Sequence, residues 1–148
     1  MNLNLRSAIA VAAVAVGAML SLGATPAAAE GAAAISATPS SGLVNGQSIE
    51  VAVTGFGAGA NLYVGQCAYL TVDKASPVCD LSSSQQVVAD AAGAGSAPLT
   101  VHSSFEGTDV ATGESVGLVD CGTVAGGCVV NAVSEDFSAF AVTDVSFG

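Results

Sequence analysis

Residues 64 to 79 read VGQCAYLTVDKASPVC and begin inside an apolar, strand-like run from Asn61 to Tyr69. Cys67 and Cys79 are close enough in sequence for one disulfide, which would hold the following loop against this strand. The two remaining cysteines, Cys121 and Cys128, enclose a still shorter loop. Two short cross-linked loops on one small domain can keep a surface rigid. We interpret that surface as a ligand cleft.

The N-terminal 29 residues have the composition of a secretory signal peptide. Arg6 precedes a run of small and apolar residues from Ala8 to Leu22. A membrane anchor is the alternative, but the run is short for a span, which takes about 20 apolar residues. We therefore predict cleavage after Ala29, with a site after Ala34 as second choice, and a secreted domain of residues 30–148.

The charge of this domain excludes some partners. Lys74 is its only Lys or Arg against all twelve Asp and Glu, which leaves a net charge of −11 with His102 neutral. One cation cannot neutralise a row of phosphates, so we expect no direct binding to DNA. Anionic membranes are disfavoured for the same reason. Repulsion between copies favours a monomer.

Four cysteines in an exported chain predict two disulfides. Three pairings are open, and we expect the sequence-local one, Cys67 with Cys79 and Cys121 with Cys128. A loop of about a dozen residues closed in this way contributes roughly 3 kcal/mol on the chain-entropy model. A metal site is the alternative, but the cysteine spacings are unusual for zinc and only one histidine is available. No metal is predicted.

The pattern beyond residue 29 indicates an all-β fold. Apolar runs alternate with Gly, Ser and Asn, and period-2 alternation is clearest over Ser48 to Thr54. We expect a seven-stranded, immunoglobulin-like Greek-key sandwich in one domain. In this interpretation residues 85–90 and 96–101 form a hairpin, and residues 138–147, apolar on both faces, form a central strand. The other expected strands are 33–38, 48–54, 61–69, 116–121 and 128–133, with short pieces near 74–81 and 108–115.

Candidate catalytic groups are few, and we predict no enzyme. His102 has Ser103 and Asp109 nearby, but adjacent strand residues point to opposite faces, and no Gly-x-Ser-x-Gly motif is present. We expect His102 to be a solvent-exposed strand residue. The acidic pair Glu135–Asp136 lacks the converging oxygens that calcium needs and is interpreted as a solvated loop.

Five sequence blocks, in order along the chain, carry a specific resemblance. They are TPSSGL at 38–43, VGQCAY at 64–69, SFEG at 104–107, VGLVDCGT at 116–123 and VSFG at 145–148. Together they resemble the neocarzinostatin family of enediyne-binding apoproteins. The resemblance implies an immunoglobulin-like sandwich with a β-ribbon subdomain and, between the two, a cleft for a non-covalent enediyne chromophore. The small molecule would cleave DNA, while the secreted protein carries, shields and releases it as an antitumour and antibacterial chromoprotein.

Carried over by position, the resemblance implies the same two disulfides and a set of ligand-binding residues. Val110 falls where the family has an aromatic, and Val129 and Val133 fall where the prototype has polar side chains. This more aliphatic cleft implies a different chromophore, or a secreted immunoglobulin-like module without an enediyne ligand. The predicted binding residues are Cys67, Tyr69, Pro77, Cys79, Leu81, Val110, Val129 and Val133.

Overall fold

The computed structural model describes residues 31–148, in which every regular element is a strand. The predicted signal peptide and its cleavage after Ala29 lie outside the described residues and stay predictions. Ten strands are present: β1 (Ala34–Thr38), β2 (Gln47–Thr54), β3 (Asn61–Tyr69), β4 (Pro77–Cys79), β5 (Gln85–Val88), β6 (Gly95–Val101), β7 (Ser104–Asp109), β8 (Ser115–Asp120), β9 (Cys128–Ser134) and β10 (Phe140–Val145).

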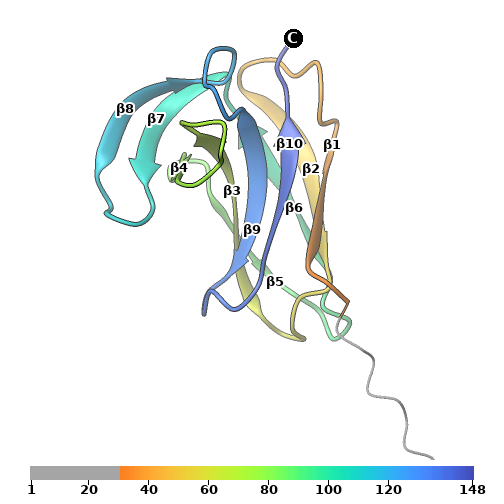
Figure 1. The fold of residues 1–148 in the computed structure, drawn as a ribbon. Helices are drawn as coiled ribbons and strands as arrows, with labels where there is room; N and C mark the ends of the chain where they lie inside the picture. Colours follow the sequence, from red (N-terminus) through yellow and green to blue (C-terminus); the bar gives the residue numbers. More distant parts are fainter. Residues whose placement is uncertain (1–30) are drawn as a thin grey trace, which may run out of the picture.

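Two antiparallel sheets pack face to face. One has the order β1-β2-β6, and the other runs β10-β9-β3-β4-β7-β8 with β5 also paired to β3. Figure 1 shows β10, β9, β3 and β5 facing the smaller sheet, whereas β4, β7 and β8 extend to one side as an arm. The predicted all-β sandwich with a ribbon subdomain is therefore confirmed.

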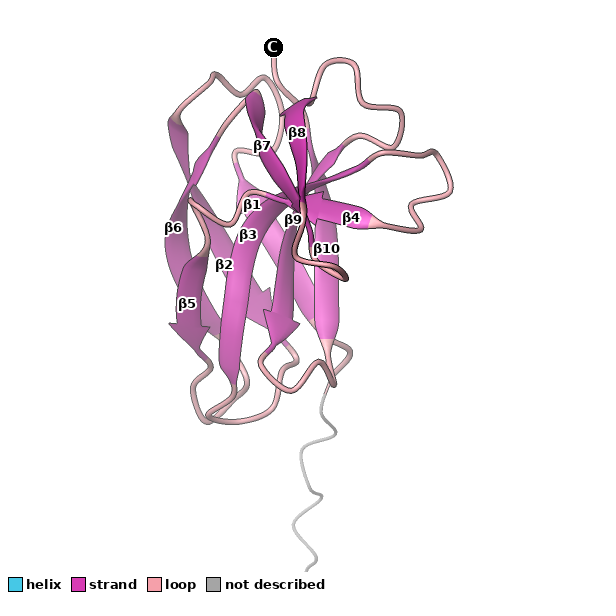
Figure 2. Ribbon diagram, turned by 90° about the vertical axis from the view of Figure 1, so that its left-hand side faces the viewer, coloured by secondary structure: helices cyan, strands magenta, loops and turns pink. Residues whose placement is uncertain are grey.

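Strand β3 is the branching point of the larger sheet. Along one edge it pairs with β9 over almost its whole length. On the other edge, Asn61 to Val64 pair with β5, and Cys67 to Tyr69 pair with β4. The partner changes at Gly65 and Gln66. Figure 2 shows the result: β5 lies along the lower end of β3, while β7 and β8 rise near its upper end.

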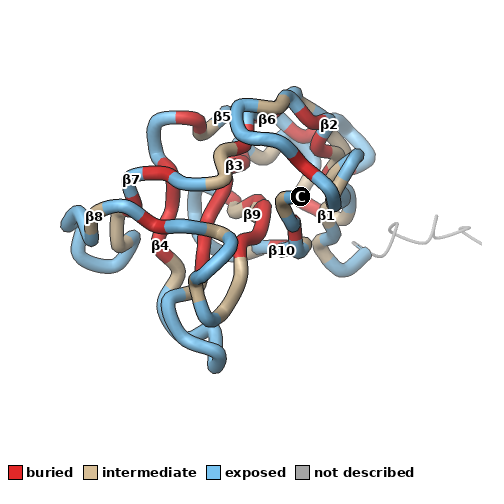
Figure 3. Tube along the Cα trace, turned by 90° about the horizontal axis from the view of Figure 1, so that it is seen from above, coloured by how far each residue is buried: buried red, intermediate tan, exposed pale blue. Residues whose placement is uncertain are grey.

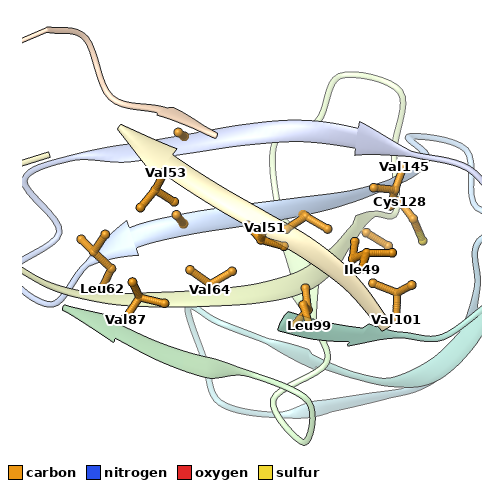
Figure 4. Close-up of a cluster of buried hydrophobic side chains, with 14 of the residues drawn as sticks. Ile49, Val51, Val53, Leu62, Val64, Val87, Leu99, Val101, Cys128 and Val145 are labelled. Carbon is orange, nitrogen blue, oxygen red and sulfur yellow. The ribbon is translucent and has the colours of Figure 1, made fainter. Parts of the chain in front are cut away.

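The core lies between the two sheets and follows the period-2 pattern of the sequence. Ile49, Val51 and Val53 of β2 point at Leu62 and Val64 of β3, and all five are at most 2% exposed (Figure 4). Burying each such side chain contributes about 1.5–3 kcal/mol. A one-residue slip of β2 would turn Glu50 into the core, so burial fixes the register. Viewed from above, β3 and β9 are largely buried, whereas β8 is largely exposed (Figure 3).

One polar side chain, that of Gln66, is fully buried beside this core. Its Nε2 donates to the His102 carbonyl oxygen at 2.6 Å, and the His102 N–H donates to its Oε1 at 2.7 Å. The Asp80 N–H donates to the Gln66 carbonyl oxygen at 2.8 Å. Gln66 thus joins three segments at the branching point: β3, the β6–β7 junction and the chain that leaves β4.

The predicted hairpin of residues 85–90 and 96–101 is wrong. β5 pairs with β3, and β6 pairs with β2, so the connection crosses from one sheet to the other. The Asp90 carboxylate caps this connection by accepting from the N–H groups of Ala92 and Ala94. Val87 and Leu99 are both buried in the core between the sheets, to which β5 contributes from the larger sheet and β6 from the smaller one.

The prediction of a central C-terminal strand is also wrong. β10 pairs only with β9 and forms the edge of the larger sheet. Ala141 and Val145 point into the core, whereas Phe140 and Val142 are 71% and 38% exposed. The apolar residues on the second face of β10 are therefore not explained by packing within the sandwich.

Replacement of Gln66 by Met should destabilise the fold, because Met is similar in length but leaves the His102 N–H and carbonyl without their partner. We expect the free energy of unfolding to fall by about 1–3 kcal/mol, measured by urea titration. Gln86→Met on exposed β5 is the matched control and should change stability by at most about 0.5 kcal/mol. Equal stability of the two variants would contradict the role given to Gln66.

Candidate functional site: a cleft where the larger sheet divides

The outer face of the larger sheet, opposite the core, has an ordered set of side chains. Residues directly opposite each other on antiparallel strands share a face, so the register of β3, β9 and β10 defines three rows. We call them the first row (Tyr63, Val133, Phe140), the middle row (Gly65, Asn131, Val142) and the last row (Cys67, Val129, Asp144).

Two residues of the last row, Cys67 and Val129, are buried under a cover of other side chains. The structure contains the disulfides Cys67–Cys79 and Cys121–Cys128, which is the sequence-local pairing. Cys67, Cys79 and Val129 pack with Tyr69 in an apolar cluster separate from the main core. Lys74 Nζ lies 5.6 Å from the centroid of the Tyr69 ring and 3.1 Å from Asp144 Oδ1. Lys74 therefore links this cover to β10.

The two disulfide-closed loops meet at the end of β3. The Tyr69 N–H donates to the Gly127 carbonyl oxygen, and the Gly126 N–H donates to the Tyr69 carbonyl oxygen. This junction is filled rather than hollow, because Val129 beneath it is only 1% exposed. A hollow lies beside the second loop, lined by residues 121–128 and the end of β10, and a separate cleft lies further along the strands, over the middle row.

A cleft of about 90 Å³ opens over the middle row. A β-carbon placed on Gly65 would lie 3.8 Å from both Asn131 Oδ1 and Ser84 Cβ, so the missing side chain of Gly65 leaves the floor open. Leu81, from the β4–β5 connection, and Val110, which follows β7 of the arm, both line the wall. The lining residues are Tyr63, Gly65, Cys67, Cys79, Asp80, Leu81, Ser84, Val110, Asn131 and Val133.

The structure brings together five of the eight sequence-predicted binding residues. Cys67, Cys79, Leu81, Val110 and Val133 line the cleft. Three others do not: Val129 is buried, and Tyr69 and Pro77 pair with each other at the covered end of β3. Ligand binding by any of the eight stays a prediction.

Sequence reasoning missed the floor of the cleft. Counting back from Cys67 by two residues along β3 reaches Gly65 and then Tyr63, which must share its face. The same count along β9 places Asn131 between Val129 and Val133. Period-2 alternation could thus have found all three residues, whereas Ser84 depends on the path of the β4–β5 connection.

Asp80 organises one wall of the cleft. It is 3% exposed, and its carboxylate accepts hydrogen bonds from the Ser82 N–H and hydroxyl, the Ser83 hydroxyl at 2.9 Å and His102 Nδ1 at 3.1 Å. Burial acts to raise the pKa of Asp80, but the hydrogen bonds from Ser82, Ser83 and His102 outweigh it and hold the pKa below its usual range. The ionised carboxylate therefore fixes the chain beside the cleft at neutral pH.

His102 is not the exposed strand residue that the sequence predicted. It lies between β6 and β7, half-buried, and its ring contacts Asp80 rather than Asp109. The Ser103 N–H donates to Asn45 Oδ1. The N–H and carbonyl groups of His102 form hydrogen bonds with the side chain of Gln66. This residue therefore lies outside the paired part of β6.

The acidic pair Glu135–Asp136 lies in the β9–β10 turn. The hydroxyls of Ser138 and Ser134, together with the Ser138 N–H, lower the pKa of Asp136 to about 2. Across residues 31–148, no three His, Cys, Asp or Glu side chains converge as metal ligands. A helix able to span a membrane is likewise absent from this described part of the chain.

Comparison with known proteins agrees with this architecture. The sequence pattern of the neocarzinostatin family matches residues 35–147. The chain belongs to the neocarzinostatin family. Macromomycin of Streptomyces macromomyceticus is 40% identical over 118 residues, covering 80% of this chain and 81% of macromomycin. The antitumor antibiotic C-1027 apoprotein of Streptomyces globisporus is 39% identical over 92 residues, 62% of each chain.

A solved structure of macromomycin has the same fold. It superposes with a TM-score of 0.70 at 37% identity, covering 79% of this chain and all of macromomycin. The residues that build the sandwich and the arm therefore follow the pattern of the family.

Lys74→Ala should expose the Cys67–Cys79 disulfide while changing overall stability little. An exposed ion pair contributes about 0–1 kcal/mol, and the contact with the Tyr69 ring a similar amount. We expect dithiothreitol to reduce this disulfide roughly two- to fivefold faster in the folded variant, as measured by thiol labelling and peptide mapping. Lys74→Arg keeps both contacts and should match the wild type. The same rate in Lys74→Ala would contradict the covering role.

Asp80→Asn should destabilise the protein in a pH-dependent manner. Because the folded pKa of Asp80 is lowered, its contribution is complete above the unfolded value of about 3.9 and is lost as pH falls through the folded pKa. At pH 7 the variant should be less stable by about 1–3 kcal/mol. The difference from wild type, followed by urea titration, should shrink below pH 4. A difference independent of pH would contradict this assignment.

Proposed function

We propose that this protein is a secreted carrier that binds an enediyne-type chromophore non-covalently, shields it and releases it. The observation that carries the proposal is the cleft over the middle row, with a glycine floor and walls from three separate segments. A relative that matches 62% of this chain is, by name, the apoprotein of an antitumor antibiotic. The proposed role is that of a carrier without catalysis.

Shielding follows from the physical properties of the cleft. Cys67, Leu81, Val110 and Val133 offer an apolar surface against which a labile group is kept from water and thiols. The disulfide fixes one side of the cleft, and the Asp80 hydrogen bonds fix another. A preformed site loses little conformational entropy when the ligand binds, so more of the contact energy contributes to affinity.

The charge and the N-terminus support a secreted, monomeric carrier. With a single lysine in the predicted mature domain, the protein would affect DNA only through the released chromophore.

Ala34 pairs with Thr54, and a β-carbon on Gly55 would lie 2.3 Å from the Ala32 carbonyl oxygen. Because residues 32–34 contribute to the fold, cleavage after Ala29 is favoured over cleavage after Ala34.

The second candidate is a secreted immunoglobulin-like module without an enediyne ligand. The small volume of the cleft, about 90 Å³, and its aliphatic wall at Val110 favour this candidate. The two functions make opposite predictions for the protein as it is isolated from the organism that produces it.

Gly65→Val tests the carrier directly, because the γ-carbons of valine would fill the floor while valine suits a strand. Wild-type protein, purified from its producer and weighed by native mass spectrometry, should carry a small molecule that denaturation removes. Gly65→Val should lose at least about 90% of this occupancy and keep its fold. Gly57→Val, in the β2–β3 connection, is the control and should retain the ligand. Wild-type protein that carries no ligand and also fails to protect an added enediyne would contradict the carrier function.

A further inference from the structure

Strand β8 is the outermost strand of the arm, and one of its edges is free. It pairs with β7 on one side, and within residues 31–148 no strand pairs with its other side. Figure 1 shows β8 at the far end of the arm, away from the sandwich. The edge strands of the sandwich are less accessible, because β5 contacts β6 and β1 contacts β10. The arm therefore ends in an uncovered strand edge.

The ladder between β7 and β8 determines which backbone groups lie on this free edge. The Cys121 N–H donates to the Ser103 carbonyl oxygen at 2.9 Å. Hydrogen-bonded and non-bonded residue pairs alternate along antiparallel strands, so Val119 bonds to β7 and Leu118 does not. The N–H and carbonyl groups of Leu118 therefore point away from β7. In the described part of the chain, neither group has another hydrogen-bond partner.

The free edge has little of the protection that usually prevents strand addition. Natural edge strands are blocked by Lys, by Pro or by a bulge that bends the edge away. Strand β8 contains neither Lys nor Pro. Its irregularity lies at its beginning, opposite Gly107 and Thr108, and the register from Leu118 to Asp120 is unbroken. These three residues therefore present a regular edge to another strand.

An apolar hollow of about 200 Å³ lies beside β8. Its lining includes Val119 and Val124, together with Leu70 from the loop that follows β3. Val119 and Leu118 are adjacent and point to opposite faces of the arm; Val119 is 5% exposed and Leu118 is 74% exposed. A cavity of about 150 Å³ can hold a benzene molecule. The hollow therefore has room for one apolar side chain of an added strand.

The charge around this edge is negative. Asp120 ends β8, Asp109 ends β7, and Glu106 lies directly opposite Leu118. Residues 104–120, which form β7, β8 and their connection, include no Lys or Arg. A second copy of this acidic chain would be repelled from the edge. A cationic partner would be attracted to it, because complementary charge favours encounter and fixes register.

We propose that the free edge of β8 binds an extended, basic peptide segment of another protein, which adds to the arm as a further antiparallel strand. Backbone hydrogen bonds to Leu118 hold the segment. One of its aliphatic residues points into the hollow beside Val119, and a Lys or Arg pairs with Asp120. This site shares no lining residue with the cleft over the middle row, so the inference goes beyond the carrier function and does not depend on it.

A fluorescein-labelled peptide with the central sequence Lys-Val-Ile between threonines, added to the mature protein, tests the backbone contacts by fluorescence anisotropy. In the proposed register its isoleucine lies opposite Leu118, its valine opposite Val119 and its lysine opposite Asp120. N-methylation of the isoleucine amide removes the hydrogen bond to the Leu118 carbonyl and should weaken the Kd at least about tenfold. N-methylation of the valine amide, which points away from β8, is the matched control and should weaken the Kd less than about threefold.

A pair of protein variants tests the same contact from the other side. Leu118→Pro removes the free-edge N–H without breaking a bond to β7, since proline is accepted at such edge positions. We expect it to weaken the Kd at least about tenfold, whereas Leu118→Thr keeps the N–H and should weaken it less than about threefold. Melting temperatures check that both variants fold. If Leu118→Pro does not fold, the two N-methylated peptides still decide.

Three results would overturn the inference. The first is no binding of the unmodified peptide by the wild type. The second is equal weakening by the two N-methylated peptides, which would indicate only nonspecific attraction between opposite charges. The third is a wild-type dimer in sedimentation that Leu118→Pro converts to a monomer, because a second copy would then occupy the edge.

Discussion

The side-chain amide of Gln66 determines where the larger sheet divides. Because this amide is fully buried, both of its ends must be satisfied inside the protein, and the backbone of His102 satisfies them. That requirement brings the β6–β7 junction against β3 at the point where β3 exchanges β5 for β4. Gln66 points toward the core, so its neighbours Gly65 and Cys67 point to the outer face. The hydrogen bonds of Gln66 and the cleft are thus two consequences of the same short stretch of strand.

Much of the fold could be predicted from the period-2 alternation of apolar residues and from the Gly, Ser and Asn residues that separate the apolar runs. β3 begins and ends where its apolar run does, and β2 follows its alternating residues within one position. Strand pairing was harder, because it depends on contacts between residues far apart in the chain. The Asp90 connection has the glycines and small residues of a hairpin turn, yet it links two sheets. Both faces of β10 have apolar residues, and the sequence alone does not distinguish a second buried face from an exposed one.

The sequence predicted only part of the candidate site, again because the rest depends on contacts between residues far apart in the chain. Family blocks and cysteine positions located Cys67, Cys79 and Leu81 near one another, and they share the cleft. They could not show that Val129 is covered by Tyr69 and the loop carrying Lys74, because that cover depends on how a longer loop folds back. They also could not locate Asp80 as a structural anion. Its buried carboxylate is explained only by the convergence of Ser82, Ser83 and His102.

The central claim is that a ligand sits on Gly65, at the branching point of the sheet. The most direct measurement is a set of intermolecular nuclear Overhauser effects between the bound chromophore and isotope-labelled protein purified with its ligand. We predict contacts from the chromophore to the Gly65 α-protons and to the side chain of Asn131. Contacts confined to another surface, such as the β9–β10 turn at Asp136, with none to Gly65, would contradict it.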